Sequence, residues 1–460
     1  MHIITQAAPS GTIQAIPAKA HAHRALIAAA LSNSPSTLRI ALYSKDIDAT
    51  ITSLCGLGAR IERTATGVTV SPISYEKKSS IDYEKKDTTG HEKKSPLGYE
   101  KKVNQDAIID AHESGTTLRL LLPVGATLGT SVKVSAAGRL PERPLEPLKS
   151  QMEAHGVQFS EAKPPFTMTG HLQGGTFNLA GNISSQFFSG LLLAAPHMAP
   201  ILDRQNQEPV VTIHSTTALQ SRDYVELTIG VMQDFGVTVT KKGDTFIVNT
   251  EQEYQGCNNY AIEGDWSNSA IWIVAAALTG QVITITGLQR HSVQADRRIM
   301  DVVKRAGLAI NWVPNSNTHE LDLHCQGKAT KPLSVDLEQM PDLLPVLAAL
   351  ACGIKGKSEF INGARLRLKE SDRLDAVTNL VNNLGGTAYC VGDNLYIEGT
   401  GHLTGGQGHC VNDHRLVMAG TLMALISNEP VTLKDSEAIS KSYPLFFNHW
   451  NQLGGHANEL

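Results

Sequence analysis

The sequence predicts an α/β protein of two domains, and three observations support this prediction. The chain has 460 residues, more than one hydrophobic core usually supports. Its composition, with 41% hydrophobic and 18% charged residues, is typical of a globular protein. A local pattern of a helix-like segment, a glycine and a strand-like segment also recurs along the chain.

The recurring pattern has six instances: LCGLGARI, MEAHGVQF, MQDFGVTV, VKRAGLAI, LVNNLGGTAY and WNQLGG. Glycine tolerates the left-handed conformation that closes a helix. The alternation that follows, as in residues 237–240, is typical of a half-buried strand. The six glycines are Gly58, Gly156, Gly236, Gly307, Gly385 and Gly454. Intervals of 69 to 98 residues between them predict six copies of one helix-and-sheet module.

Residues 74–105 lie in the widest of these intervals. They form an eight-residue tandem repeat, SYEKKSSI, DYEKKDTT, GHEKKSPL and GYEKKVNQ. Eight is not a helical period and the segment has no apolar face, so it cannot bury a core. We interpret it as a solvated insertion in a surface loop, and a basic tether for an acidic partner is the alternative.

Composition and motifs also exclude several classes of function. A net charge of -4 is unlike that of nucleic-acid binders. Six cysteines without a CxxC pair, a start unlike a signal peptide and apolar stretches too short for a bilayer predict a cytoplasmic protein. Nucleotide-binding glycine motifs, HExxH and GxSxG are missing, so we expect neither a metal nor a cofactor.

Several segments place cations or small polar groups at the starts of predicted helices, which attract anions. IPAKAHAHRALIAAAL places Lys19 at a helix start and Arg24 one turn in. In ESGTTLR, Ser114 can cap a helix, and Gly115 lets an anion approach the backbone. The proline-rich segment GRLPERPLEP holds Arg143 in a loop, where its planar guanidinium could bind two oxygens of an anion.

An uncharged donor cluster opens another predicted helix, because NISSQF contains Ser184, Ser185 and Gln186. In RLKESDRL, Lys369 and Arg373 are four apart, so we expect them on one helix face, with Glu370 on the adjacent face.

Two further segments lie near the end of the chain. NDHRLVMA places Asp413 as a helix cap and Arg415 in the first turn, where the helix dipole disfavours a cation unless an anion lies nearby. SKSYP places Lys441 just before a helix. Each segment alone fits an ordinary surface helix. Together they predict a site for ligands rich in phosphate and carboxylate.

Taken in order, these motifs resemble those of the 5-enolpyruvylshikimate-3-phosphate synthases, or 3-phosphoshikimate 1-carboxyvinyltransferases. The resemblance runs from about residue 11 to about residue 447, apart from the insert. It rests on Lys19 with Arg24, SGTTLR, ERP, SSQF, EGDWSNSA, PD, LKESDRL, NDHR and SKSYP. Any one of these pieces is weak, whereas all of them in order are specific.

The resemblance implies a two-domain inverted α/β barrel with helices inside and three βαβαββ units in each domain. One domain would span residues 18–264, with the insert and the shikimate 3-phosphate contacts. The other would comprise residues 1–17 and 265–460, with the catalytic carboxylates and the phosphoenolpyruvate contacts. The substrates would be these two small molecules, bound by a cytoplasmic and monomeric enzyme with no nucleic-acid or membrane partner.

The resemblance also implies residue roles. Asp342 and Glu370 would be the general base and acid, with Lys19 as a third catalytic residue. Shikimate 3-phosphate would contact Lys19, Ala20, Arg24, Ser184, Ser185, Gln186, Ser221, Tyr224, Asp342 and Lys369. Phosphoenolpyruvate would contact Lys19, Gly115, Arg143, Gln186, Arg373, Arg415 and Lys441. Proton transfers in both directions would suit two carboxyls with separated pKa values.

The chain departs from the family pattern around the first lysine. The family usually has Ser-Lys-Ser, and here Ala18 and Ala20 flank Lys19. His21 or His23 could supply the lost donors. Glu113 stands where the family often has Asn, and Arg365 matches a second family Asn.

Three alternative functions follow from the same residues. The sister enzyme that acts on UDP-N-acetylglucosamine usually relies on a loop cysteine, and none lies between 112 and 145. A non-catalytic binding relative and a purely structural repeat protein are the other two.

Overall fold

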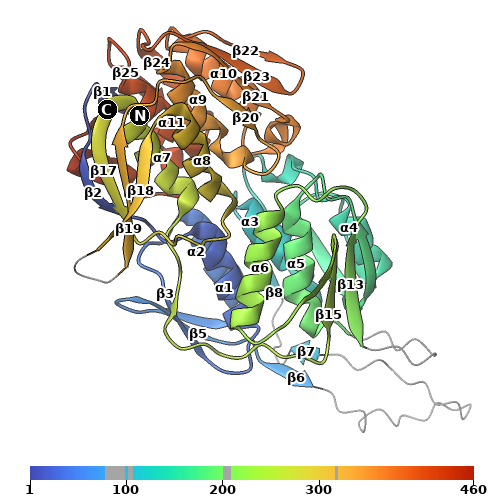
Figure 1. Cartoon of the computed structure of the whole chain (residues 1–460). Coiled ribbons are helices and arrows are strands. Elements are labelled where there is room, and N and C mark those ends of the chain that lie inside the picture. The colour runs from blue at the N-terminus through green and yellow to red at the C-terminus, as the bar shows by residue number, and fades with distance from the viewer. Residues whose placement is uncertain (78–98, 102–106, 200–208, 316–319) are drawn as a thin grey trace, which may run out of the picture. The chain divides into compact units, whose positions relative to one another are not determined.

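The computed structural model describes residues 1–77, 99–101, 107–199, 209–315 and 320–460. The chain forms two compact units (Figure 1). Unit 1 comprises Met1–Lys19, Leu42–Lys45 and Glu263–Leu460, and unit 2 comprises Ala20–Ala41 and Asp46–Ile262. Residues 78–98 and 102–106 lie outside the described residues. They include most of the insert, so our interpretation of the insert stays a prediction.

Each unit contains three four-stranded sheets of one topology, in which a parallel pair is extended by two antiparallel strands. In unit 2 the sheets are β16 (Tyr260–Ala261), β3 (Ser36–Arg39), β5 (Gly67–Ser71) and β4 (Arg60–Arg63); β8 (Ala107–Asp110), β9 (Val132–Ser135), β11 (Phe166–Gly170) and β10 (Val157–Phe159); and β12 (Gly175–Leu179), β13 (Val210–Ser215), β15 (Thr245–Asn249) and β14 (Thr240–Lys242).

In unit 1 the sheets are β2 (Gly11–Gln14), β17 (Gly280–Thr286), β19 (Leu321–Gly327) and β18 (Ala309–Pro314); β20 (Ser334–Asp336), β21 (Gly356–Ile361), β23 (Asn394–Gly399) and β22 (Ala388–Val391); and β24 (Gly406–His409), β25 (Val431–Lys434), β1 (His2–Thr5) and β26 (His456–Glu459). A separate hairpin pairs β6 (Tyr75–Lys77) with β7 (Tyr99–Lys101) at the ends of the insert. These sheets confirm the repeated module that the glycine pattern predicts.

Helices connect the strands of each module. They are α1 (Lys19–Ala30), α2 (Lys45–Gly56), α3 (Gly115–Ala126), α4 (Leu148–Ala154), α5 (Ser185–Ala194), α6 (Arg222–Asp234), α7 (Trp266–Thr279), α8 (Ile299–Ala306), α9 (Leu344–Cys352), α10 (Arg373–Asn383), α11 (His414–Ala424) and α12 (Phe446–Gln452). Short 3₁₀ helices are η1 (Leu140–Glu142), η2 (Ala195–His197), η3 (Ala295–Arg298), η4 (Pro341–Leu343), η5 (Ala364–Leu368) and η6 (Ser436–Lys441). None of the described helices is long and apolar enough to cross a bilayer.

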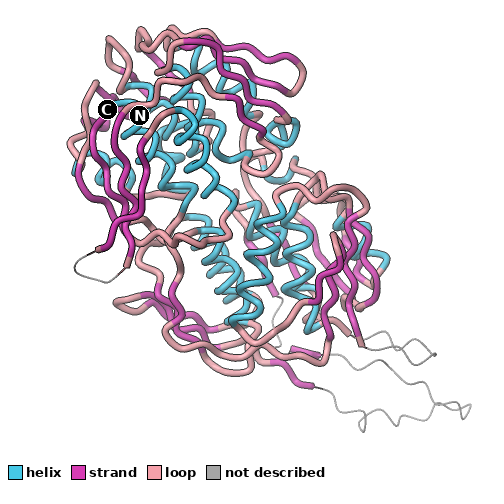
Figure 2. The backbone as a smooth tube through the Cα atoms, in the orientation of Figure 1, coloured by secondary structure: helices cyan, strands magenta, loops and turns pink. Residues whose placement is uncertain are grey.

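The core of unit 1 is built on helices that are apolar on every side. All residues of α9 are buried, as are most of α7 and α11, and these three helices pack on one another. A helix without a polar face is stable only when it is surrounded, so sheets must cover it. In each unit the helices lie inside and the strands outside (Figure 2).

The six glycines of the repeat close helices as predicted. All six have positive φ, between 83° and 109°. They follow α2, α4, α6, α8, α10 and α12, which is one helix in each module. A side chain would be strained in this left-handed conformation, so the sequence signal has a direct physical cause.

Candidate active site

Asp342 lies in η4, immediately before the buried helix α9. Its carboxylate faces the Nζ atom of Lys369 at 3.1 Å, Nη1 of Arg373 at 2.6 Å and Nη2 of Arg415 at 3.6 Å. Arg415 also donates to the Asp342 carbonyl at 3.0 Å. Burial opposes ionisation of Asp342, but the three cations outweigh it and hold its pKa well below the ordinary value.

Glu370 is the second carboxylate of this cluster. Its Oε2 atom lies 3.2 Å from Nη2 of Arg373 and 3.1 Å from Nδ1 of His414. Burial opposes its ionisation too, whereas the charges of His414, Arg373 and Lys19 hold its pKa well below the ordinary value. Both carboxyls are therefore held ionised, and a separation between their pKa values stays a prediction.

Arg373 joins these groups and is itself fixed by a third carboxylate. Its side chain is 2% exposed and that of Asp413 is fully buried. Nε of Arg373 donates to Oδ2 of Asp413 at 2.8 Å, and Nη2 donates to Oδ1 at 3.2 Å. Asp413 also caps α11 by accepting from the Arg415 backbone N–H at 3.0 Å, and it accepts from Ser371 at 2.9 Å. This bidentate ion pair fixes the plane of the Arg373 guanidinium.

The local fold around RLKESDRL differs from the sequence prediction. Lys369 and Glu370 precede α10, which begins at Arg373, so Lys369 and Arg373 do not share a helix face. Asp372 sets this boundary, because its side chain accepts the Asp375 backbone N–H and caps the helix. Both cations nevertheless reach Asp342.

The sequence analysis missed Asp296, in η3. It is 1% exposed, and its Oδ2 accepts a hydrogen bond from the Ser267 hydroxyl. Its Oδ1 has no hydrogen-bond partner in the described part of the chain. Burial raises the pKa of Asp296 to about 6, while Arg415 opposes the shift and Asp342 adds to it. The segment QADRR has no periodicity or motif that could have identified this residue.

Two more predicted cations belong to unit 1. Lys441 ends η6 and donates to the Asn412 carbonyl at 2.7 Å. The backbone N–H of Lys19 donates to Oδ2 of Asp265 at 3.0 Å. Asp265 also caps α7, so it fixes the starts of two helices at once.

In unit 2 the predicted residues fall into two groups. The first centres on Arg24, which is 1% exposed and donates to Thr228, Ser189 and the carbonyls of Ala20 and Tyr224 at 2.7 to 3.3 Å. Burial lowers its pKa to about 10, which leaves it charged at neutral pH. Its bonds within the unit account for most of its donors, so it fixes α1 against α6.

The second group surrounds Gly115, the first residue of α3. A Cβ atom built there would lie 2.7 Å from Nη1 of Arg143 and 3.0 Å from Nη1 of Arg119. Arg119 donates to Oε1 of Gln186 at 3.1 Å, and Gln186 donates to Thr116 at 2.8 Å. Two cations and an amide therefore converge on the start of α3, as a helix-terminal anion site requires.

The predicted hydroxyls lie at helix starts. Ser114 caps α3 and Ser184 caps α5, each through its side chain. Ser185 is the first residue of α5, and Ser221 precedes α6 with a φ of 52°. Tyr224, one turn into α6, takes part through its carbonyl.

The two histidines near Ala18 and Ala20 each make a hydrogen bond within unit 2. His23 is fully buried, with Nδ1 2.7 Å from the Thr50 hydroxyl. His21 Nε2 lies 2.8 Å from the Tyr260 hydroxyl, and burial with the nearby charge of Arg24 lowers the pKa of His21 to about 4. Both rings are therefore engaged inside unit 2, and His21 is uncharged at neutral pH.

One group of side chains has a metal-like arrangement. Ligand atoms of Glu370, Asp413 and His414 lie within 4.8 Å of one another. Arg373 already donates to both carboxylates, so a cation would have to displace a buried guanidinium. The group is better described as an ion-pair network.

The family model described as EPSP synthase (3-phosphoshikimate 1-carboxyvinyltransferase) matches residues 4–89 and 80–450. A 3-phosphoshikimate 1-carboxyvinyltransferase of Clostridium acetobutylicum is 36% identical over 453 residues, covering 98% of this chain and 96% of the relative. One of Clostridium kluyveri is 35% identical over 456 residues with the same coverage. The solved EPSP synthase of Acinetobacter baumannii is similar in fold, with a TM-score of 0.77 at 21% identity, over 100% of this chain and 99% of that one.

Proposed function

Because the chain belongs to the EPSP synthase family, we propose that the residue groups described above carry out that family's reaction. The enzyme transfers the enolpyruvyl group of phosphoenolpyruvate to the 5-hydroxyl of shikimate 3-phosphate and releases phosphate, a step of the shikimate pathway. The observation that carries the residue assignment is the cluster of Asp342, Glu370 and Arg373, in which a buried cation contacts two half-buried carboxylates.

Unit 1 supplies the proton-transfer groups. The hydroxyl must lose a proton as its oxygen bonds to C2 of the enolpyruvyl group, and C3 must gain a proton. Asp342 suits the role of base because the surrounding cations keep it ionised. Glu370 suits the second role, with Lys19 contributing charge beside it. The resulting tetrahedral adduct collapses when phosphate leaves and the added C3 proton is removed.

Glu370 can act as an acid only when its pKa rises. A bound phosphate or carboxylate would compete for Arg373, and a second anion in the cluster favours the protonated carboxyl. We therefore expect substrate binding to raise the pKa of Glu370.

We divide the predicted binding residues between the two substrates, and Lys19 and Gln186 are assigned to both. We assign Arg373, Arg415, Lys441 and Lys19 in unit 1, and Gly115, Arg143 and Gln186 in unit 2, to phosphoenolpyruvate. Shikimate 3-phosphate is assigned to Lys19, Asp342 and Lys369 in unit 1, and to Ala20, Arg24, Ser184, Ser185, Gln186, Ser221 and Tyr224 in unit 2. Of these, Arg24 is the most strongly committed to internal bonds, so its contribution is mainly to position α1 and α6.

Phosphate release with both substrates, and with each omitted in turn, tests the proposed reaction. Release that requires both substrates supports it. Release with UDP-N-acetylglucosamine in place of shikimate 3-phosphate would contradict the acceptor. Binding without release would favour the non-catalytic relative. We also propose that the enzyme is a cytoplasmic monomer without nucleic-acid or membrane partners, and sedimentation of the purified protein checks its oligomeric state.

A further inference from the structure

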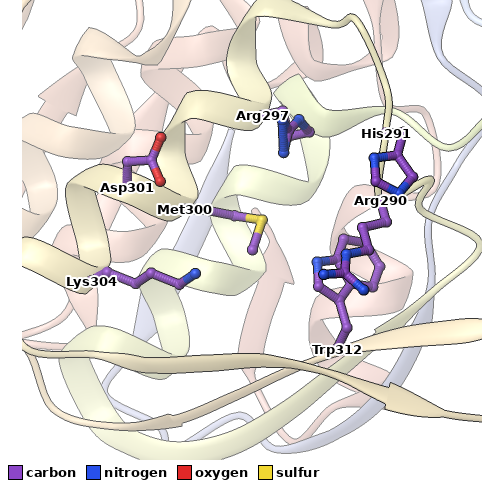
Figure 3. Close-up of a pocket in the computed structure, with 7 residues that line it drawn as sticks. All are labelled: Arg290, His291, Arg297, Met300, Asp301, Lys304 and Trp312. Carbon is purple, nitrogen blue, oxygen red and sulfur yellow. The ribbon is translucent and has the colours of Figure 1, made fainter.

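A pocket lies in unit 1, beside α8, and has a volume of about 290 Å³ (Figure 3). Arg297, Asp301 and Lys304 line one side of it. These positions are spaced by four and three residues, so η3 and α8 present them along one face. Trp312 of β18 lines the opposite side, and His291 lies next to it in Figure 3.

The pocket has an excess of positive charge. Arg290, in the loop after β17, is a third cation beside Arg297 and Lys304, and Asp301 is the one carboxylate among the lining residues, which leaves an excess of two positive charges. None of these four exposed side chains forms an ion pair with another residue that the structure describes. Three cations without a protein counter-ion on one concave surface favour an anionic ligand.

The pocket also has an apolar part. Trp312 is half-buried, and its ring meets Trp266 edge-on, with centroids 6.0 Å apart and an interplanar angle of 70°. Because Trp312 is half-buried and lines the pocket, part of its indole ring is open to a ligand there. The buried side chain of Met300 lies between Trp312 and Lys304 in the close-up, and its thioether adapts readily to ring-shaped ligands.

We propose that this pocket binds a phosphate monoester that carries a planar ring, the chemistry of a nucleoside monophosphate. The phosphate carries about -1.5 to -2 charge at neutral pH, which matches the excess of two positive charges. Arginines bind such oxygens in a bidentate manner, and a base stacks on an open indole face. The proposal does not rest on the assigned reaction, because no lining residue belongs to the Asp342 cluster.

Isothermal titration of the full-length protein with AMP tests the proposal, with adenosine and inorganic phosphate as separate ligands. We expect AMP to bind at least about tenfold more tightly than either fragment, since both halves of the pocket are then used. Saturating phosphoenolpyruvate and shikimate 3-phosphate should leave AMP binding unchanged. Loss of binding under those conditions would place AMP in the substrate site and overturn the proposal.

Three variants test whether AMP binds in this pocket. The double variant Arg290→Ala and Lys304→Ala should weaken AMP binding by about tenfold or more. Arg305→Ala, which removes an exposed cation of the same helix outside the pocket, should leave it unchanged. Trp312→Leu should weaken AMP binding while phosphate binding stays as in the parent. Equal AMP affinity in the parent and the double variant, or equal affinity for phosphate and AMP, would refute the assignment.

Discussion

Nη1 of Arg373 donates to Oδ1 of Asp342 across 2.6 Å, while Nε and Nη2 of the same guanidinium bind Asp413. One buried cation therefore joins the carboxylate that we propose as the base to the carboxylate that caps α11. Asp413 is in turn fixed as the cap of α11. The position of Asp342 thus depends on a helix terminus far away in sequence.

Asp342→Asn should lower kcat by about 100-fold or more, because an amide cannot accept the substrate proton. The variant keeps the shape of the side chain but loses the charge that pairs with Lys369, Arg373 and Arg415, so its unfolding free energy is measured beside its turnover. Asp336→Asn, an exposed carboxylate of the same unit, is the matched control and should retain parental turnover. Near-normal phosphate release by Asp342→Asn would remove the base assignment.

Gly115→Ala should raise KM for phosphoenolpyruvate by about tenfold, a loss of about 1.4 kcal/mol. The added methyl would lie 2.7 Å from Nη1 of Arg143, so that side chain must move. Glyphosate should inhibit the parent in competition with phosphoenolpyruvate, and more weakly in the variant. Gly230→Ala is the control, because nothing lies within 4 Å of a Cβ atom there. If Gly115→Ala and Gly230→Ala had similar kcat and KM values, the assignment of Arg143 to phosphoenolpyruvate would be wrong.

Asp296→Asn should stabilise unit 1 above pH 6, by about 2–3 kcal/mol from the size of the pKa shift. Its folded-state pKa is about 6 and its ordinary value 3.8. Between these values the folded protein holds a proton that the unfolded chain has released, so the contribution of Asp296 to stability falls as pH rises. Below pH 3.8 both states are protonated and the contribution is flat.

Urea unfolding at pH 4 and pH 8 measures this effect, with the parent protein as the reference at each pH. All four tryptophans lie in unit 1, so their fluorescence reports on that unit alone. If the difference in unfolding free energy between variant and parent were the same at both pH values, the pKa of Asp296 would not be raised in the folded protein.

Deletion of residues 74–105 should leave turnover within about twofold of the parent. Ile73 is held by a backbone hydrogen bond to the Ala30 carbonyl at 2.8 Å, and β8 begins at Ala107, so both ends are anchored without the repeat. Replacement of the segment by a Gly/Ser linker of equal length controls for loop closure. Substantial loss of activity in both variants would favour a functional role for the repeat.

Local signals in the sequence predict the parts of the structure that have local causes. The six closing glycines and the caps Ser114, Ser184 and Asp413 act within a few residues of themselves, so their roles could be predicted. The shared helix face predicted for Lys369 and Arg373 was wrong because Asp372 caps α10, so the helix begins only at Arg373.

Contacts between distant segments could not be predicted in this way. Asp296 approaches Arg415 and Asp342 only in the folded unit, and its sequence surroundings carry no pattern. The burial of His21 and His23 could not be predicted for the same reason, because their partners Tyr260 and Thr50 belong to other elements. The resemblance identified the carboxylates, but their charge states depend on the packed environment.

Strand β1 lies between β25 and β26, with His2 opposite Leu433 on one side and Glu459 on the other. A strand that precedes unit 2 in the chain is therefore paired with two strands that follow unit 2. Residues of unit 2 emerge from the ribosome before either partner exists, so unit 2 can fold while β1 still has two unpaired edges. Assembly of unit 1 is accordingly the late step of biosynthesis, and the interval before it is when the nascent chain most needs protection from aggregation.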